Sequence, residues 1–393
     1  MQKVKRSIVE ELKSFLAFFL FGVGFLQFSL VLAGCGPHEK VARIAVALPL
    51  TGDIAGLGQG INRACALALE EANSQHRFNG YRVEIAAFDD RSDPREAVDV
   101  ANRIVSDPSV VAVIGHFNSG CSIPASRVYA QAHLPMISPA ASNPKLTLQQ
   151  LDPSWTYPKS IFRVNTTDDV QGPYAAEFAV KTLHARRACI IDDKTTYGEG
   201  VATEFKKRFE ALGGVTLSFD GVAVADKDFN ALLTRLRELH PQVIYWGGDY
   251  AGGGLIVRQT RGVGEKAPIL LSEANYDPEF LKVAGSAAEG CYVTFLGSPP
   301  ELLPSAKAFM TAYQARYPDV EVKAYDHYGY EAMNILLDLV QKVGPDREKI
   351  LAALPSVDYK GVLGETRFDA KGDTLNHTIT LFQVKDGKFA PIK

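Results

Sequence analysis

Short apolar segments with strand-like composition alternate along the chain with longer segments in which apolar residues recur at helical spacing. The expected strands are Arg43–Leu48, Arg82–Phe88, Val110–Ile114, Leu134–Ile137, Ala188–Ile191, Thr216–Phe219, Val243–Trp246 and Ile269–Ser272. The expected helices are Gly60–Asn73, Asp93–Ser106, Gly172–Leu183, Gly198–Leu212 and Phe229–Leu239, and a glycine-rich turn precedes the first of them. Apolar strands that alternate with helices are typical of parallel sheets covered by helices on both faces. The pattern therefore predicts an α/β protein.

The length of the chain and the expected strand ends indicate where a ligand would bind. At 393 residues the chain is too long for one compact core and suits two lobes of roughly 100–200 residues each. In parallel α/β sheets ligands bind beyond the carboxyl ends of the strands. The residues that follow the expected strands are Thr51-Gly52, Asp89-Asp90, His116–Ser119, Ser138–Ser142, Tyr197, Gly247–Tyr250 and Ser272–Asn275. They are rich in Gly, Ser, Asp and Tyr, as the lining of a polar cleft would be.

The first 34 residues differ from the rest of the chain. Three basic side chains lie within residues 3–6, an apolar stretch runs over 15–32, and Leu32-Ala33-Gly34-Cys35 closes it. This order predicts a signal peptide over 1–34. Its end resembles the lipobox of bacterial lipoproteins, in which the cysteine is acylated, so that Cys35 begins a lipidated spacer over 35–40. The alternative is an uncleaved transmembrane helix, because about 18 apolar residues nearly span a bilayer. Both interpretations export the rest of the chain.

Charge and cysteine content narrow the function classes. Residues 1–34 hold four basic and two acidic side chains, so the remainder carries 38 basic and 43 acidic side chains, a net charge of about −5. A mildly acidic chain with scattered Lys and Arg is unlike a nucleic-acid binder. The four later cysteines have wide spacings and form no CxxC or zinc-type cluster, so buried free thiols are expected. These cysteines are Cys65, Cys121, Cys189 and Cys291, and a disulfide between two of them stays open as the alternative.

Three polar residues after expected strands are candidates for holding a zwitterion. Ser119 lies at a helix start, where hydroxyl and backbone N–H groups hold an anion, and the alternative is a plain N-cap. Ser142 would give the same anion a second hydroxyl and the carbonyl of Ala140 would accept from an ammonium, the alternative being a proline-bounded turn. Glu273 is suited to pairing with an amino group, and the alternative is a solvated surface glutamate.

Motifs of enzymes and cofactor sites are incomplete or missing in the sequence. Gly56-Leu57-Gly58-Gln59-Gly60 after the first strand resembles a dinucleotide fingerprint, but Ile61 stands where the third glycine belongs. The eight histidines are dispersed with no ligand-like pair. Neither a Gly-x-Ser-x-Gly elbow nor a Walker loop occurs. We therefore expect no cofactor, no metal and no catalytic residue, and predict that the protein is not an enzyme.

A series of short motifs runs in a fixed order over nearly the whole chain beyond residue 34. They are Asp89-Asp90-Arg91-Ser92-Asp93-Pro94 with Ala97-Val98 and Ala101-Asn102, Ile114-Gly115-His116, Ser138-Pro139-Ala140-Ala141, Asp193-Lys194 with Tyr197-Gly198-Glu199-Gly200, Lys227-Asp228-Phe229, Gly247-Gly248, Glu289-Gly290, Phe368-Asp369 and Lys371-Gly372-Asp373. Each motif alone is weak and the ordered set is specific. It resembles the leucine/isoleucine/valine-binding proteins, the type I periplasmic solute-binding proteins of branched-chain amino-acid ABC importers.

The resemblance implies a type I periplasmic-binding-protein fold with two lobes, each a parallel sheet flanked by helices. Three strands would cross between the lobes near residues 160–165, 288–292 and 361–366. Lobe one would comprise 41–160 plus 292–361, and lobe two 165–288 plus 366–393. Ligand binding would close the hinge and bury the ligand between the lobes.

The resemblance also implies a set of ligand-binding residues: Ser119, Ala140, Ala141, Ser142, Tyr197, Asp249 and Glu273. Ser119 and Ser142 would hold a carboxylate, Glu273 the ammonium, and Tyr197 would close over the ligand. Branched-chain-specific members usually have aromatic residues at the positions of Leu57 and Asp249. An acid at 249 would give the ammonium a second counter-charge or contact a polar ligand side chain, and Tyr250 would restore the ring if the loop differs by one residue. The cysteine pair that bridges in some members is replaced by Ser92 and Asn118, so that bridge is missing.

These implications predict an extracytoplasmic binding protein that delivers an amino acid, of the branched-chain type or a related one, to an ABC transporter permease. It would be a monomer, anchored through a lipid at Cys35 to the periplasmic face of a membrane, or to the cell surface where there is no outer membrane. Two other functions stay open. In the first, the protein binds an amide, urea or an aromatic acid instead of an amino acid. In the second, it is a lipoprotein that senses a ligand. An exported enzyme is the remaining class.

Overall fold

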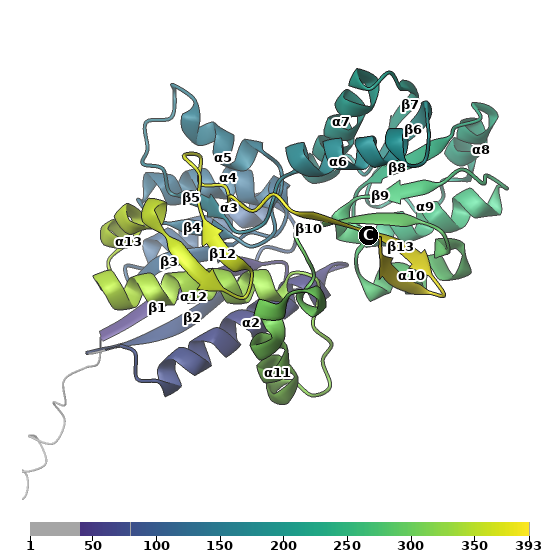
Figure 1. Ribbon diagram of the computed structural model, residues 1–393. Coiled ribbons are helices and arrows are strands. Elements are labelled where there is room, and N and C mark those ends of the chain that lie inside the picture. The colour runs from purple at the N-terminus through teal and green to yellow at the C-terminus, as the bar shows by residue number, and fades with distance from the viewer. Residues whose placement is uncertain (1–39, 79, 393) are drawn as a thin grey trace, which may run out of the picture. The chain divides into compact units, whose positions relative to one another are not determined.

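The computed structural model describes residues 40–78 and 80–392, and one of its two larger sheets has five strands in the order β2-β1-β3-β4-β5 (Figure 1). Their bounds are β1 Lys40–Leu48, β2 Tyr81–Asp89, β3 Val110–Gly115, β4 Met136–Ser138 and β5 Ile161–Arg163. The pairs β1–β3, β3–β4 and β4–β5 are parallel. The expected signal segment, and with it Cys35, lies outside the described residues.

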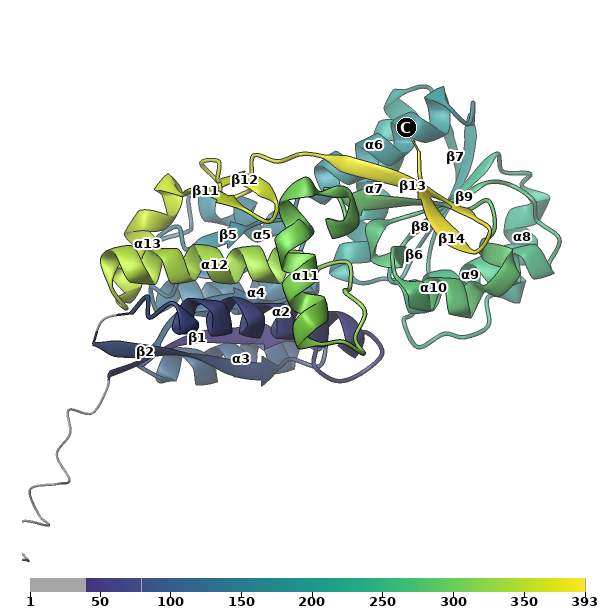
Figure 2. The ribbon, with the colours of Figure 1, turned by 60° about the horizontal axis from the view of Figure 1, so that its bottom comes forward.

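Helices cover both faces of this sheet, and Figure 2 shows α12 and α2 stacked on one face. α2 (Ala55–Ser74) packs against α12 (Asp326–Val343), while α3 (Pro94–Ser106) and α4 (Ser119–Gln131) share the other face. Ala45 and Ala47 point into the α3–α4 core, and Ile44 and Val46, which alternate with them along the strand, are also fully buried. Because both faces of β1 are buried, it appears in the sequence as a continuous apolar run.

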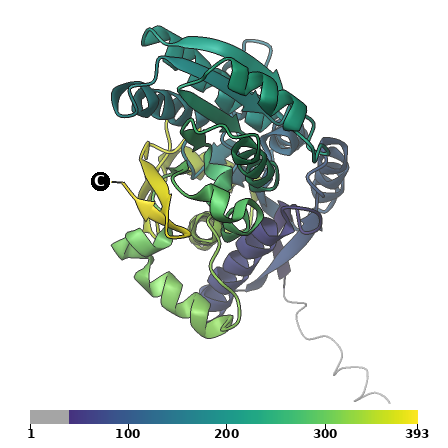
Figure 3. The ribbon, with the colours of Figure 1, turned by 90° about the vertical axis from the view of Figure 1, so that its right-hand side faces the viewer.

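The second large sheet has seven strands in the order β14-β13-β10-β9-β8-β6-β7. Their bounds are β6 Arg187–Asp192, β7 Val215–Gly221, β8 Val243–Gly247, β9 Ile269–Leu271, β10 Tyr292–Leu296, β13 Ile379–Lys385 and β14 Lys388–Pro391. The strands from β7 to β10 pair in parallel, and β13 and β14 add an antiparallel edge, the yellow hairpin of Figure 3. The sheet is thus mostly parallel, as predicted.

Helices also flank the seven-stranded sheet. α6 (Asp168–Lys181) and α7 (Thr196–Ala211) pack together and form a core with strands β6, β8 and β9, while α9 (Tyr250–Gly262) packs with α8 (Asn230–Glu238) and α10 (Pro278–Ala284). The remaining elements are the hairpin β11 (Asp358–Gly361) and β12 (Gly364–Arg367), the helices α5 (Lys145–Leu148), α11 (Lys307–Arg316) and α13 (Arg347–Ala353), and the 3₁₀ turns η2 (Gln149–Leu151), η3 (Glu273–Asn275), η4 (Gly285–Ala288), η5 (Pro300–Leu302), η6 (Pro304–Ala306) and η7 (Leu354–Ser356). Within the described residues no helix has the length and apolar character to cross a membrane.

The expected start of the first helix at Gly60 is wrong, because α2 already begins at Ala55, and the only glycine in the turn before it is Gly52. Gly58 and Gly60 serve close packing rather than a turn. A Cβ on Gly58 would lie 2.1 Å from the carbonyl oxygen of Pro49, and one on Gly60 would lie 2.1 Å from Oδ1 of Asp326. Only glycine therefore lets the first turns of α2 approach the preceding loop and α12 this closely.

Candidate functional site

One cavity, of about 490 Å³ counting the part that is open to solvent, brings the seven predicted ligand-binding residues together. Its lining residues are Ile54, Leu57, Phe117, Asn118, Ser119, Ala140, Ala141, Ser142, Asp193, Thr195, Tyr197, Asp249, Glu273, Ala274 and Tyr325. Polar side chains converge in this cavity beside apolar ones, as they do in the sites of small molecules.

Two hydroxyl groups reach the cavity from loops at the carboxyl ends of β3 and β4. Ser119 is the first residue of α4, and its Oγ accepts a hydrogen bond from the backbone N–H of Asn143 (3.2 Å). The Oγ of Ser142 is buried and has no hydrogen bond within 3.5 Å among the described residues, although the carboxyl of Asp168 lies near it. A buried unpaired hydroxyl is costly. Ser142 is therefore available to a ligand group.

A buried chain of side chains holds the loop that carries Ser119. Nδ1 of His116 lies 2.6 Å from Oδ2 of Asp90, and its Nε2 lies 2.9 Å from the hydroxyl of Tyr129. Asp90 follows β2 and Tyr129 lies on α4, so His116 joins the β2–α3 and β3–α4 connections. In the structure this histidine is a positioning group, and it does not line the cavity.

Arg163, the last residue of β5, and Asn165, two positions later, hold the Ala140–Asn143 loop in place through hydrogen bonds. The fully buried guanidinium of Arg163 donates from Nη1 to the carbonyl oxygens of Ala141 (2.9 Å) and Asn143 (3.0 Å). Its Nε pairs with Oδ1 of Asp373 (2.5 Å). Nδ2 of Asn165 donates to the carbonyl of Ala140 (2.9 Å), which uses one lone pair of that carbonyl and leaves the other.

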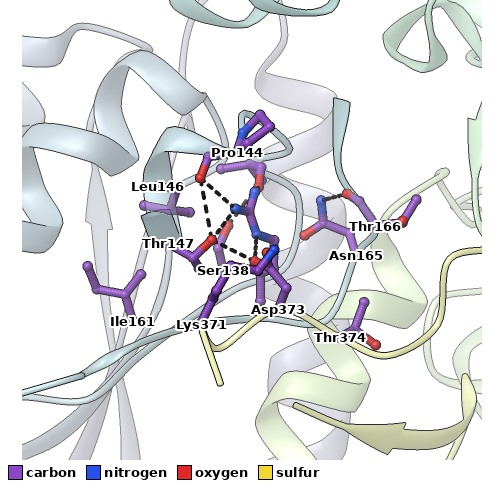
Figure 4. A network of polar contacts seen from close by, with 12 residues as sticks. Ser138, Pro144, Leu146, Thr147, Ile161, Asn165, Thr166, Lys371, Asp373 and Thr374 are labelled. Carbon is purple, nitrogen blue, oxygen red and sulfur yellow. Dashed lines mark hydrogen bonds and ion pairs between the residues drawn. The ribbon is translucent and has the colours of Figure 1, made fainter. Parts of the chain in front are cut away.

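Figure 4 shows the same network around Thr147 and Asp373, which face each other. Oγ1 of Thr147 donates to Oδ1 of Asp373 (2.7 Å) and accepts from Nη2 of Arg163 (2.7 Å). Lys371 adds a second ion pair to Asp373 (2.9 Å). The network ties the β4–α5 connection, the end of β5 and the segment before β13 into one unit.

Glu273 forms the acidic part of the cavity and is 2% exposed. It opens the turn η3 after β9, and its Oε2 accepts a hydrogen bond from the hydroxyl of Tyr197 (2.5 Å). The hydroxyl of Tyr325 lies 3.4 Å from its Oε1. Burial raises the pKa of this carboxyl, and the hydrogen bond from Tyr197 opposes the rise. A positive ligand group beside Glu273 would offset the cost of burying the charge.

Two further carboxyl groups, those of Asp193 and Asp249, line the same cavity. Asp193 follows β6, and burial raises its pKa to about 6 although the hydroxyl and N–H of Thr195 stabilise the charge. Asp249 caps α9 by accepting from the N–H of Gly252 at Oδ1 (3.0 Å), and burial raises its pKa as well. Tyr250 does not line the cavity, and its hydroxyl donates to the carbonyl of Asp53 (2.7 Å).

Four residues of the lining were not among the residues that the sequence put forward: Ile54, Asp193, Thr195 and Tyr325. Asp193 directly follows β6, so the strand-end rule contained a signal for it. Tyr325 precedes α12 and follows no strand of either sheet, so nothing in its sequence context marks it.

The described residues contain no cluster of His, Cys, Asp or Glu suited to a metal ion. The four cysteines that follow residue 39 are free and buried. Burial raises the pKa of the Cys189 thiol to about 11, and those of the other three rise further. These thiols are therefore protonated and unreactive at neutral pH.

A family model described as periplasmic binding protein matches residues 41–388. The chain belongs to this family. Its members are binding proteins rather than enzymes, and the resemblance found in the sequence is confirmed, together with the α/β fold of mostly parallel sheets. Among curated relatives, Leu/Ile/Val-binding protein homolog 2 of Brucella abortus is 35% identical over 88% of this chain and 91% of its own length. The leucine-, isoleucine-, valine-, threonine-, and alanine-binding protein of Pseudomonas aeruginosa is 33% identical over 90% and 94%.

Solved structures of this family have the same fold. The leucine binding protein LivK of Thermotoga maritima superposes with a TM-score of 0.80 at 30% identity, covering 90% of this chain and 98% of its own. The branched-chain amino acid transporter substrate binding protein LivJ of Streptococcus pneumoniae, solved in complex with isoleucine, gives 0.79 at 26% identity, covering 90% and 99%.

Proposed function

We propose that this protein captures an α-amino acid, of the branched-chain type or a related one, outside the cytoplasm and delivers it to the permease of an ABC importer. Relatives over most of the chain are named as binding proteins for such amino acids. The observation that carries the proposal is that one cavity contains both the unpaired hydroxyl of Ser142 and the buried carboxylate of Glu273. These two groups match the two charged ends of an amino acid.

In the proposed pose, the hydroxyls of Ser119 and Ser142 donate to the ligand carboxylate at the N-terminus of α4, whose dipole favours an anion. The ligand ammonium donates to Glu273 and to the free lone pair of the Ala140 carbonyl. Tyr197 stays on Glu273 and covers the ligand. Each polar atom of a buried zwitterion then has a partner, which burial requires.

We also propose that the two large sheets are the cores of two lobes that close over the ligand. The second segment of lobe one was expected to begin at residue 292. It would instead begin after Leu296, because Tyr292–Leu296 forms β10 of the seven-stranded sheet. Several contacts join the halves and would break on opening, among them Tyr250 hydroxyl to Asp53 carbonyl (2.7 Å), Asn143 Nδ2 to Thr196 carbonyl (2.9 Å) and Lys323 Nζ to Asp277 Oδ1 (3.2 Å). Lipidation at Cys35, a monomeric state and a place on the outer side of a membrane complete the proposal.

Calorimetry on residues 36–393, freed of ligand by unfolding and refolding, tests this proposal against a panel of amino acids. We expect binding of at least one α-amino acid and a loss of at least ten-fold in affinity in Glu273→Gln, which keeps the shape and removes the charge. Glu301→Gln is the matched control, because Glu301 also accepts from a tyrosine hydroxyl, that of Tyr276 (2.7 Å), but is exposed and lies outside the cavity. Binding of no amino acid, or equal affinity in Glu273→Gln, would contradict the proposal.

A further inference from the structure

The cavity holds more negative charge than an ordinary amino acid neutralises. Asp193, Asp249 and Glu273 line it, and no lysine, arginine or histidine does so in the described part of the chain.

The oxygens of two of the lining acids are already in use. Oδ1 of Asp193 accepts from the N–H (3.0 Å) and the hydroxyl (2.6 Å) of Thr195, and its Oδ2 faces the N–H of Asp249 (3.4 Å). Glu273 has the hydroxyl of Tyr197 and, in the proposed pose, the α-ammonium. Asp249 accepts from the N–H of Gly252 at Oδ1 and is also stabilised by the N–H of Ala251, which leaves lone pairs on Oδ2 for a ligand.

An amino acid with an apolar side chain brings one positive and one negative charge into this space. Glu273 and the two serine hydroxyls match these charges. The carboxylate of Asp249 is half-buried and feels the charge of Lys227, which lies outside the lining, so without a positive partner in the cavity it keeps part of the cost of burying a charge. A second positive group on the ligand would remove this cost. The unpaired, buried hydroxyl of Ser142 shows independently that the same cavity is built for a polar ligand.

We propose that the ligand carries a cationic side chain, as diamino and guanidino amino acids do, and that the carboxylate of Asp249 pairs with it. The inference rests on the proposed function and specifies its substrate class. The methylene stem of such a side chain packs on apolar surface while its charged end reaches a polar group. Ile54, Leu57 and Phe117 supply apolar surface in the cavity.

Calorimetry with lysine, ornithine, arginine, leucine and norleucine tests this inference, because norleucine has the carbon chain of lysine without the terminal ammonium. We expect at least one cationic amino acid to bind at least ten-fold more tightly than norleucine and leucine. In Asp249→Asn, which keeps the helix cap because Asn caps as well as Asp, this preference should fall at least ten-fold while the affinity for norleucine stays the same or rises. The matched control is Asp53→Asn, which removes an exposed carboxylate near Asp249 and should leave the preference unchanged.

The outcomes separate this inference from the function on which it rests. If leucine or norleucine binds as tightly as every cationic amino acid, the inference is wrong and the amino-acid function stands. The same conclusion follows if Asp249→Asn weakens lysine and norleucine equally, since the residue would then act through the helix cap. If no amino acid binds to folded, ligand-free protein, both fail.

Discussion

Replacing Arg163 by Met should destabilise the protein strongly at neutral pH. Arg163 is fully buried, and the change removes its ion pair with Asp373 and its hydrogen bonds to the carbonyls of Ala141 and Asn143. Breaking a buried pair by removing one partner costs about 3–5 kcal/mol. Because Lys371 still pairs with Asp373 (2.9 Å), we expect the lower end, about 3 kcal/mol in the free energy of unfolding.

The dependence of this loss on pH identifies the ion pair as its cause. Burial alone would raise the pKa of Asp373, but the charge of Arg163 and the hydrogen bond from Lys371 more than offset it and lower the pKa. The pair therefore contributes stability above the unfolded-state pKa of about 3.9, and loses it as the pH falls through the lower folded-state pKa. In the variant the pKa of Asp373 rises, so the two proteins should differ less at pH 4 than at pH 7.

Urea denaturation of the ligand-free proteins at pH 7 and pH 4 measures both effects. Arg208→Met is the matched control, since Arg208 pairs with Glu177 at the surface, where a salt bridge contributes about 0–1 kcal/mol. A loss below about 1 kcal/mol for Arg163→Met at pH 7 would refute the role assigned to this pair. A loss that is as large at pH 4 would attribute the effect to the carbonyl contacts instead.

Two other changes test the buried carboxyl of Glu331 and the free hydroxyl of Ser142. Burial raises the pKa of Glu331 to about 7 despite hydrogen bonds from Thr366 and Val362, so the folded state holds the extra proton and stability falls as pH rises from about 4.5 to 7. In urea denaturation, Glu331→Gln should therefore raise the free energy of unfolding by up to about 3 kcal/mol at pH 8 and change it little at pH 4.5. Equal changes at both pH values would contradict this. Ser142→Ala should raise the unfolding free energy of the unliganded protein by about 1 kcal/mol, because it removes a buried hydroxyl that has no hydrogen bond, and it should weaken amino-acid binding about ten-fold by calorimetry. Unchanged affinity would remove Ser142 from the site.

The sequence predicted much of the candidate site because one rule of parallel sheets applies to it. Ser119, Ser142 and Glu273 follow β3, β4 and β9, and the carboxyl ends of parallel strands meet at one edge of each sheet. The strands themselves were clear because they are buried on both faces. The start of α2 was missed because propensity places glycines in turns, whereas here Gly58 and Gly60 have contacts with Pro49 and Asp326 that leave no room for a side chain.

Contacts between distant segments had no signal in the sequence. Asp373 pairs with Arg163 across 210 positions, and an arginine at the end of a short apolar strand looks like an ordinary exposed residue. Tyr325 reaches Glu273 from the loop before α12, which follows no strand. Such partners depend on how the chain returns from one sheet to the other, and a local pattern does not contain that information.

The polar groups of the structure fall into two sets: those that already have hydrogen-bond or ion-pair partners, and those in the cavity whose burial is not fully offset by partners. The buried frame around Arg163 and His116 already has its partners without any ligand. In the cavity, by contrast, the hydroxyl of Ser142 has none, and burial raises the pKa values of Asp193, Asp249 and Glu273. A ligand that matches these groups would therefore meet a preorganised frame and lose little free energy to ordering it. The groups that face the cavity still carry the free-energy cost of burial without partners, and a matching ligand would remove it. Such a ligand should therefore bind tightly and raise the stability of the folded protein by RT ln(1 + [L]/Kd).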